Sequence, residues 1–478
     1  MKPALPHLPA LRRGRAYTSL DQASVKDCRS GQAVASVSQV NAGILRKDLA
    51  RISESRAALK RFSSEELIGM CERAAELFVQ ATLPLGDEGR TQSAEQYVET
   101  LSATSGLPFV MVRRNMQKIA QALRNMRTVI NGLTRGLDLS VIDRGFGEQG
   151  GARLSFYPAA QCLGLVMPSN SPGVNSLWLP AIPLKIPVIL KPGRDEPWTP
   201  LRLIQALVAA GCPAEAFGFY PTDHEGAGEI LRLCGRALVF GDKTTTAQYA
   251  NNPAIQVHGP GLSKILIGDD QIERWPEFLD PMVSSISDNG GRSCINASAV
   301  VVSKYAAEIA EALGRALGPI APRPARDEGA RLCAFANRGM SEGIDGLIED
   351  GLRTPGAVDV ATKYRNGARK TVFEGATYLR PTIVRCDSFG HPLANREFLF
   401  PYASVVQVPQ ADMLGQIGPS LVVTAITNDA GFRQALLESP LIERLNLGPI
   451  STMQVSWDQP HEGNLFDFLY RRRAIEMA

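Results

Sequence analysis

The chain has 478 residues, of which 44% are apolar and 21% are charged, the composition of an ordinary globular protein. Its length fits two large lobes or about three domains of ~150 residues each. The 51 basic and 48 acidic side chains leave a net charge of only +3, which is too small for electrostatic binding of nucleic acid. No apolar run reaches the length of a membrane-spanning helix, because prolines and a lysine interrupt even residues 177–190. The start of the chain shows no apolar signal segment, so we expect a cytoplasmic protein.

Eight cysteines are scattered along the chain without a CxxC pair, and only five histidines accompany them. Zinc sites need such residues in closely spaced pairs, and disulfide frameworks are typical of short secreted chains. We therefore predict neither disulfides nor a bound metal ion.

The N-terminal part of the chain predicts an irregular start followed by helices. Residues 1–35 are rich in proline, arginine and serine without a regular period, which indicates a surface arm or a disordered end. Ser63 and Glu66 form the pattern of a capping box, so a helix is expected to begin there. Apolar residues spaced by three and four predict a long amphipathic helix over residues 112–133. Its basic residues are interpreted as a solvated face without chemistry; they are Arg113, Arg114, Lys118, Arg124 and Arg127.

After residue 150, short apolar runs alternate with helical segments. The runs are residues 163–167, 187–191, 217–220, 237–240 and 255–257. Strand, helix and strand in sequence indicate parallel strands with right-handed crossovers, and a second alternating region follows residue 260. We therefore predict an α/β protein of two lobes with open, mostly parallel sheets. In such sheets ligands bind beyond the carboxyl ends of the strands, so the residues that follow each run are the candidates for a site.

The common short signatures of phosphate-binding loops, Rossmann dehydrogenases, serine hydrolases and zinc proteases do not occur in the sequence. A polar, glycine-containing stretch over residues 287–298 instead delivers Cys294 just before the apolar run 299–302. A nucleophilic thiolate needs polar backbone and a nearby cation that lower its pKa. On these local features Cys294 is a candidate nucleophile, with a buried thiol or a tolerated loop cysteine as the alternatives. The other cysteines lack this setting and are interpreted as packing residues.

Four residues in a fixed order, Asn170, Lys191, Cys294 and Glu397, lie in sequence motifs of one family. A Pro-x-Asn-x-Pro loop surrounds Asn170, a proline follows Lys191, and Glu397 begins Glu-Phe-Leu-Phe-Pro. Over roughly residues 150 to 410 the chain therefore resembles the aldehyde dehydrogenase superfamily. The last motif departs from the family pattern at its third and fourth residues, on the side of the site where the family holds nicotinamide.

The resemblance implies a nucleotide-binding lobe and a lobe that carries the thiol, with the reaction in the cleft between them, in a homodimer or homotetramer. The implied partners are a nicotinamide cofactor and a small aldehyde or acyl thioester. Together with the element pattern, the resemblance divides the chain into an arm, a nucleotide-binding lobe with a bridging strand segment near 138–157, a catalytic lobe and a returning C-terminal segment. Their predicted bounds are 1–35, 36–260, 261–440 and 441–478.

The resemblance also implies how the thiol reacts. The Cys294 thiolate attacks an aldehyde, the side-chain amide of Asn170 and the backbone N–H of Cys294 hold the oxyanion, and hydride leaves to nicotinamide. The product is a thioester on Cys294. Without the resemblance, Asn170 between two prolines would be interpreted as an ordinary turn residue.

Five residues form the implied cofactor site: Pro168, Lys191, Arg194, Gly241 and Glu397. The family places the lysine on the adenosine ribose and the glutamate on the nicotinamide ribose, and Gly241 would let the backbone approach the pyrophosphate. The residues after Gly241 depart from the family's usual glycine loop. Arg194 stands where NAD-preferring members have an acidic residue and suits the 2′-phosphate of NADP, so we expect NAD or NADP. The alternative for Arg194 is a solvated arginine paired within its own turn.

The clearest departure from the family is His258, at the position where hydrolytic members carry a glutamate that activates water. Imidazole, with an ordinary pKa near ~6.5, could be the base itself, which would give a hydrolytic enzyme. Alternatively coenzyme A takes or supplies the acyl group, because the Gly-Pro-Gly at 259–261 and the Asp-Asn at 288–289 are similar to acylating members such as fatty acyl-CoA reductases. We lean toward the acylating reaction. A structural role for His258, and a catalytically inactive nucleotide-binding scaffold, are the remaining alternatives.

Overall fold

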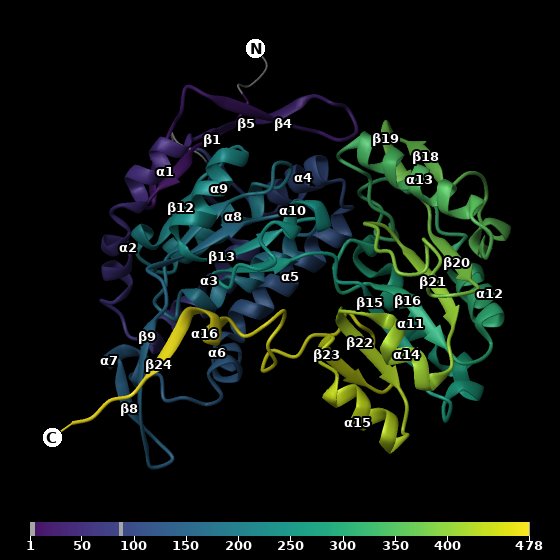
Figure 1. Cartoon of the computed structure of the whole chain (residues 1–478). Helices are drawn as coiled ribbons and strands as arrows, with labels where there is room; N and C mark the ends of the chain where they lie inside the picture. The colour runs from purple at the N-terminus through teal and green to yellow at the C-terminus, as the bar shows by residue number, and fades with distance from the viewer. Residues whose placement is uncertain (1–4, 86–88, 478) are drawn as a thin grey trace.

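Two seven-stranded sheets organise the chain, one in each of two α/β lobes (Figure 1). The computed structural model describes residues 5–85 and 89–477. In Figure 1 the purple to teal elements form the first lobe, the green elements form the second, and the yellow C-terminal segment runs from the second lobe back to the first. The predicted fold class, two α/β lobes with mostly parallel sheets, is confirmed.

The sheet of the first lobe has the strand order β14-β13-β10-β11-β12-β2-β3. Its five parallel strands correspond to the five predicted runs: β10 (Cys162–Val166), β11 (Val188–Lys191), β12 (Phe217–Phe219), β13 (Gly235–Phe240) and β14 (Ile255–His258). Most of their side chains are buried on both faces, which is why these strands read as continuous apolar runs. Strand order reverses across β10, so ligands are expected at the carboxyl ends of these strands.

The described N-terminal residues form strands, which differs from the expected surface arm or disordered end. β2 (Ala10–Arg12) pairs antiparallel with β12 and is followed by β3 (Arg15–Tyr17). A separate sheet contains β1 (His7–Leu8), β4 (Gln22–Lys26) and β5 (Ala33–Ser38). These strands are two to six residues long and depend on pairing with distant residues, so they produce no detectable period in the sequence.

Helices of the first lobe precede and flank its parallel strands. They are α1 (Ala42–Leu49), α2 (Ile52–Leu59), α3 (Ser64–Gln80), α4 (Ala94–Ser105), α5 (Phe109–Arg124), α6 (Met126–Thr134), α7 (Ser140–Arg144), α8 (Trp198–Ala209), α9 (His224–Leu233) and α10 (Lys243–Ala247). The predicted capping box of Ser63 and Glu66 is present and begins α3. The helix predicted over 112–133 is instead two helices, α5 and α6, because the backbone of Asn125 leaves the helical region with ψ of 19°.

The sheet of the second lobe has the order β17-β20-β21-β16-β15-β22-β23. Its strands are β15 (Ser263–Ile267), β16 (Ala297–Val302), β17 (Ala357–Asp359), β20 (Thr382–Cys386), β21 (Tyr402–Gln407), β22 (Ser420–Ile426) and β23 (Ile442–Leu447). Only β17 is antiparallel to its neighbour. The helices of this lobe are α11 (Leu279–Ser287), α12 (Ala306–Leu317), α13 (Arg338–Arg353), α14 (Gln410–Ile417) and α15 (Ala430–Glu438). Two short hairpins lie outside the two large sheets, β6 (Leu83–Pro84) with β7 (Thr91–Gln92) and β18 (Lys370–Phe373) with β19 (Ala376–Leu379).

The C-terminal segment connects the two lobes. After β23, residues 448–464 cross from the second lobe to the first without a helix or strand, and we call them the strap (Figure 1). They lead into α16 (Leu465–Leu469) and β24 (Tyr470–Arg473), which pairs antiparallel with β9 (Ala152–Pro158) beside β8 (Phe146–Gln149). None of the helices formed by the described residues has the length and apolar character needed to cross a membrane.

Candidate active site

Carboxyl ends of the parallel strands in the first lobe meet at one edge. Val166 at the end of β10 is paired with Lys191 at the end of β11, and Phe240 of β13 is paired with His258 of β14. The loops that leave these strands therefore lie side by side. This arrangement brings Lys191, Gly241 and His258 to the edge where open α/β sheets bind ligands.

Cys294 lies in a tightly turned loop between α11 and β16. Asn289, Gly290 and Gly291 all have left-handed backbone, with φ of 55°, 65° and 68°. Asparagine and glycine adopt this conformation at the lowest cost, which accounts for the Asn-Gly-Gly sequence. Gly291 is further constrained because a Cβ there would overlap the carbonyl group of Phe400. These residues turn the chain sharply just ahead of the cysteine.

The turn after β14 supports the cysteine loop from the other side. A Cβ on Gly261 would overlap the carbonyl oxygen of Cys294, so only glycine allows the two segments to approach this closely. Ser263 donates from Oγ to the same carbonyl oxygen at 2.9 Å. The segment that carries His258 and the segment that carries the thiol are therefore packed directly against each other.

Asn170, the predicted oxyanion donor, also contacts the cysteine loop. Its Nδ2 donates to the carbonyl oxygen of Arg292 at 2.8 Å, across 122 residues of sequence. Beside it, Nδ2 of Asn289 donates to Oγ of Ser171 at 3.2 Å and to Oγ of Ser293 at 3.0 Å. These bonds hold the Asn170 amide next to the backbone that leads into the thiol. Its action on an oxyanion stays a prediction.

The Cys294 thiol faces a cavity and contacts a carboxylate that sequence reasoning missed. Sγ donates to Oε1 of Glu462, in the strap, at 3.1 Å. Burial raises the pKa of Cys294 to about 12, the nearby Glu397 adds to this, and Lys118 opposes it. The thiol is therefore protonated at neutral pH, and a base that removes its proton is required before it can attack.

Glu462 also contacts His258, so one carboxylate lies between the thiol and the imidazole. Oε2 of Glu462 accepts a hydrogen bond from Nδ1 of His258, and the Glu462 carbonyl oxygen accepts one from the side chain of Gln256. The imidazole stacks on Phe240 with ring centroids 4.4 Å apart, and burial lowers the pKa of His258 to about 4. Its Nε2 is buried without a hydrogen bond from any described residue. The imidazole is thus neutral, oriented by a carboxylate, and has a free ring nitrogen.

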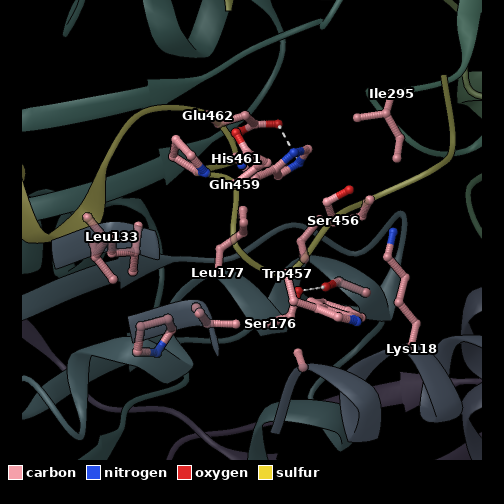
Figure 2. Close-up of a pocket in the computed structure, with 18 of the residues that line it drawn as sticks. Lys118, Leu133, Ser176, Leu177, Ile295, Ser456, Trp457, Gln459, His461 and Glu462 are labelled. Atoms are coloured by element: carbon pink, nitrogen blue, oxygen red, sulfur yellow. Dashed lines mark hydrogen bonds and ion pairs between the residues drawn. The ribbon is translucent and has the colours of Figure 1, made fainter. Parts of the chain in front are cut away.

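A cavity of about 970 Å³, counting the open solvent at its mouth, lies in front of the thiol. Its walls come from α5 and α6, the loop after β10, the cysteine loop and the strap (Figure 2). Most of the lining is apolar, including Met126, Val129, Leu177, Ile295 and Trp457. A concave, mostly apolar cavity with a few polar groups is the usual form of a site for a small organic molecule.

Lys118 corrects the interpretation of the basic helix face. It is not solvated with the other basic residues but half-buried, and it points into the cavity toward Ser456, past the ring of Trp457 (Figure 2). Lys118 begins a stripe on α5 and α6 whose further members, spaced by four and three, also line the cavity: Ala122, Met126, Val129 and Leu133. That second stripe was the sequence signal that could have identified it.

On the cofactor side, Lys191 and Arg194 follow β11. The Lys191 side chain is half-buried, and among the described residues its Nζ donates only to the carbonyl oxygen of Pro192 at 3.4 Å. Burial, and secondarily the charge of Arg194, lower the pKa of Lys191. Arg194 is exposed and forms no ion pair with a described residue, whereas Glu196 lies buried beneath the turn and accepts from Thr199. Two cationic side chains without an acidic partner thus lie at the end of one strand.

The turns beside them are closely packed. A Cβ on Gly193 would overlap the carbonyl oxygen of Pro168, so the loops after β10 and β11 contact each other through backbone. Gly241 precedes the short helix α10, whose N-terminus is already capped because the Asp242 carboxylate accepts from the N–H of Thr245 at 2.8 Å. At least one backbone donor that could meet a pyrophosphate at this helix start is therefore engaged with the chain's own carboxylate.

Glu397 is held by the turn that supports the thiol. Its Oε2 accepts from the N–H of Leu262 at 2.7 Å, and burial raises the pKa of Glu397 to about 8. Lys264 is buried close by, with Nζ donating to Oγ of Ser420 at 3.0 Å, and burial lowers its pKa to about 7. The expected contact of Glu397 with a nicotinamide ribose stays a prediction, and sequence reasoning did not find Lys264.

The sequence model of the aldehyde dehydrogenase family matches residues 87–416, more than half of the chain. The chain belongs to this family. It is therefore an NAD(P)-dependent oxidoreductase that acts on aldehydes. In this aldehyde dehydrogenase the strap, with Glu462, lies outside the matched residues.

Solved structures of low sequence identity share the fold over almost their whole length. An NADP dependent enzyme from E. coli is 16% identical, with a TM-score of 0.77 over 98% of both chains. An indole-3-acetaldehyde dehydrogenase in complex with NAD⁺ is 16% identical, with a TM-score of 0.77 over 98% of this chain and 96% of that one. The aldehyde dehydrogenase KauB from Pseudomonas aeruginosa is 15% identical, with a TM-score of 0.78 over the same shares. A search of curated protein sequences gave no significant match.

Proposed function

We propose that this aldehyde dehydrogenase oxidises an aldehyde to a carboxylic acid through a thiohemiacetal and then a thioester on Cys294. One observation carries the proposal: the Cys294 sulfur lines a cavity and donates to Glu462 at 3.1 Å, with His258 on the other oxygen of that carboxylate. A nucleophile, a base in contact with it and space for a carbonyl group are the parts that covalent catalysis requires.

The first step is the transfer of the thiol proton to Glu462 as sulfur bonds to the aldehyde carbon. A thiol with a pKa of about 12 supplies almost no thiolate at neutral pH, so the contact with Oε1 of Glu462 is the feature that makes attack feasible. Negative charge then develops on the former carbonyl oxygen. We assign the Asn170 amide and the Cys294 N–H to receive this charge, since Asn170 contacts the backbone just ahead of the thiol, and one such donor is worth ~2.7–4 kcal/mol in a dry site.

The second step is the loss of hydride from the thiohemiacetal carbon, for which a bound nicotinamide ring supplies the acceptor. The residues at the end of β11 fit the adenosine end of such a cofactor, because the half-buried Lys191 ammonium has only one long hydrogen bond. The capped start of α10 fits a pyrophosphate less well. The remaining carbon is at the oxidation level of an acid and stays bound to sulfur as a thioester.

The third step is the release of the acyl group, for which we propose water. The acylating alternative draws on the missing carboxylate at residue 258 and on the motifs at 259–261 and 288–289, and the first of these grounds is weakened because the strap brings the Glu462 carboxylate to His258. Glu462 lines the cavity and is held by Nδ1 of His258, so we assign to this pair the proton of the water molecule that attacks the thioester. Water then gives the acid, the thiol is regenerated, and one aldehyde, one water and one oxidised cofactor have become one acid, one reduced cofactor and a proton.

For the cofactor we propose NADP rather than NAD. Arg194 lies three residues beyond Lys191, is exposed, and forms no ion pair within contact distance with a described residue, although its charge acts on Asp195. A free guanidinium beside the ribose-binding lysine is suited to a 2′-phosphate. Fluorescence titration should give tighter binding of NADP than of NAD, and Arg194→Ser should reduce that preference by ~10-fold or more, as expected for loss of one charge-assisted pair. Equal binding of both cofactors by the parent protein would contradict the choice.

A single assay tests the reaction and separates it from its alternatives. The full chain is mixed with NADP⁺ or NAD⁺ and a panel of aldehydes, with and without coenzyme A, and reduced nicotinamide and the acyl product are measured. The proposal expects reduction without coenzyme A and a free acid as product. Turnover only when coenzyme A is present would identify the acylating reaction. The absence of turnover together with an alkylation-resistant Cys294 would leave the scaffold alternative.

A further inference from the structure

Lys118 places a positive charge without a partner inside the apolar cavity. The residue is half-buried on α5, its side chain extends toward Ser456, and no described residue forms a hydrogen bond or ion pair with its ammonium group (Figure 2). Burial is the largest influence on it and lowers the pKa of Lys118. A buried charge is costly unless a partner compensates it, so this position favours an anionic group bound inside the cavity.

Of the four arginines on the same two helices, Arg114 is exposed and the other three form ion pairs. Their guanidinium groups pair with carboxylates at the surface: Arg113 with Glu95 at 2.9 Å, Arg124 with Glu76 at 2.7 Å and Arg127 with Glu65 at 2.6 Å. Acidic partners are therefore available along these helices, and Lys118 alone among these cations turns inward without one. Its inward orientation indicates that the ammonium group interacts with a molecule bound in the cavity.

Positive charge exceeds negative charge around the cavity. Arg444 of β23 is half-buried, its guanidinium lies within hydrogen-bond distance of Nδ1 of His461 and the carbonyl oxygen of Thr452, and its charge acts on Lys118 and on Cys294. Burial, together with both cations, lowers the pKa of His461 to about 3, so this ring is neutral. Glu462 is the one acidic side chain that lines the described cavity, and it is already engaged by Cys294 and His258.

We propose that the substrate of this enzyme is an aldehyde that carries a carboxylate at its far end, and that the Lys118 ammonium binds that carboxylate. The inference rests on the proposed oxidation at Cys294 and names the substrate class for it. The apolar walls between the thiol and the lysine suit a hydrocarbon spacer, and one monovalent cation in direct reach suits a single carboxylate. The charge of Arg444 adds to the positive potential around Lys118, but its guanidinium already donates to the carbonyl oxygen of Thr452 in the strap.

Two substrates matched in length test the proposal, one a linear aldehyde with a terminal carboxylate and the other with a terminal methyl group. Wild type is expected to favour the carboxylate-bearing aldehyde in kcat/KM. In Lys118→Met this preference should fall by ~10- to 100-fold, mostly through KM, because one charge-assisted contact is lost. Lys118→Arg, which keeps a cation, should restore most of the preference. Arg124→Met on the outer face of the same helix is the matched control and should leave the preference as it is.

A second measurement needs no turnover and no variant. Iodoacetamide labelling of Cys294 in the wild-type protein is followed in the presence of linear dicarboxylates or of monocarboxylates of the same length. The dicarboxylate should protect the thiol at ~10-fold lower concentration, since only it can occupy the lysine while lying along the cavity.

The two measurements distinguish failure of this proposal from failure of the proposed function. If the enzyme oxidises aldehydes but Lys118→Met changes both substrates by the same factor, the lysine acts on the thiol and the substrate assignment is wrong. If no aldehyde is oxidised, the oxidation proposal fails, while unequal protection by the two acids would still support an anion site at Lys118. Equal protection by both acids overturns the anion site in either case.

Discussion

Residues around the thiol come from two regions that are built in different ways. Cys294, Asn170 and His258 lie at the ends of strands and helices of the two lobes or in the loops that leave them. The order of the parallel strands determines which of these loops lie next to each other. Glu462 and His461 lie in the strap, which contains no helix or strand and is positioned by β23 at one end and α16 at the other. The comparison separates the group that bonds to the substrate from the group that moves its proton. We therefore expect loss of the nucleophile to abolish the reaction, whereas loss of the strap carboxylate or of the Asn170 amide should slow it.

The largest effect is expected at the nucleophile. Cys294→Ser replaces sulfur with an oxygen that is far harder to deprotonate, and kcat should fall by at least ~10⁴-fold, as for loss of other covalent nucleophiles. Steady-state production of reduced cofactor measures this. Cys28→Ser, which alters a half-buried cysteine outside the described cavity, is the control and should retain activity. Full activity of Cys294→Ser would remove the basis of the covalent mechanism.

A smaller but still large effect is expected in the strap. Glu462→Gln keeps the shape of the side chain but cannot accept the thiol proton, so kcat/KM should fall by ~10²- to 10⁴-fold. Glu443→Gln changes an exposed carboxylate nearby in sequence and should have no such effect.

The pH dependence of thiol alkylation sharpens this test. Because the pKa of Cys294 is raised to about 12, its thiolate fraction rises ~10-fold per pH unit throughout the neutral range when no base assists. The Glu462→Gln variant should show this full slope with iodoacetamide between about pH 6 and pH 9. Wild type should react faster at neutral pH and with a shallower slope. Identical profiles for the two proteins would mean that Glu462 does not activate the thiol.

The sequence predicted the residues of the strand loops better than those of the strap. The five strands of the first sheet are continuous apolar runs, so both the runs and the polar residues after them could be located, and Cys294 could be singled out by its polar, glycine-rich surroundings. Glu462 carries no such signal, because its approach to residues 258 and 294 depends on how the chain returns across both lobes. Lys118 was placed on the wrong helix face because a neighbouring stripe was more regular. Strands β1 and β2 were too short to show a period.

An intermediate effect is expected for the loop after β10. Asn170→Ala removes the amide that contacts Arg292 and the proposed oxyanion donor, so kcat should fall by ~10²- to 10³-fold with little change in KM. Asn170→Ser, whose hydroxyl is too short to reach both groups, should lie close to the alanine variant. A change confined to KM would assign the residue to substrate binding instead, and would weaken the division between strand loops and strap.

The smallest effect is expected at the anchor of the strap. Asn464 caps α16, its Oδ1 accepting from the N–H groups of Phe466 and Asp467, while its Nδ2 donates to the carbonyl oxygen of Leu133 at 2.9 Å. Asn464→Ala should lower the free energy of unfolding by ~1–2 kcal/mol, the usual cost of losing a helix cap, as measured by urea denaturation.

The same helix offers a control for the anchor. The Arg135–Asp467 ion pair has side chains that are 66% and 51% exposed, so Arg135→Ala should change stability by less than ~1 kcal/mol. If the strap positions the base, Asn464→Ala should also slow alkylation of Cys294, although less than Glu462→Gln does, because the carboxylate is still present but less firmly placed. Lower stability with an unchanged alkylation rate would mean that packing between the lobes, and not the anchor, holds Glu462 against the thiol.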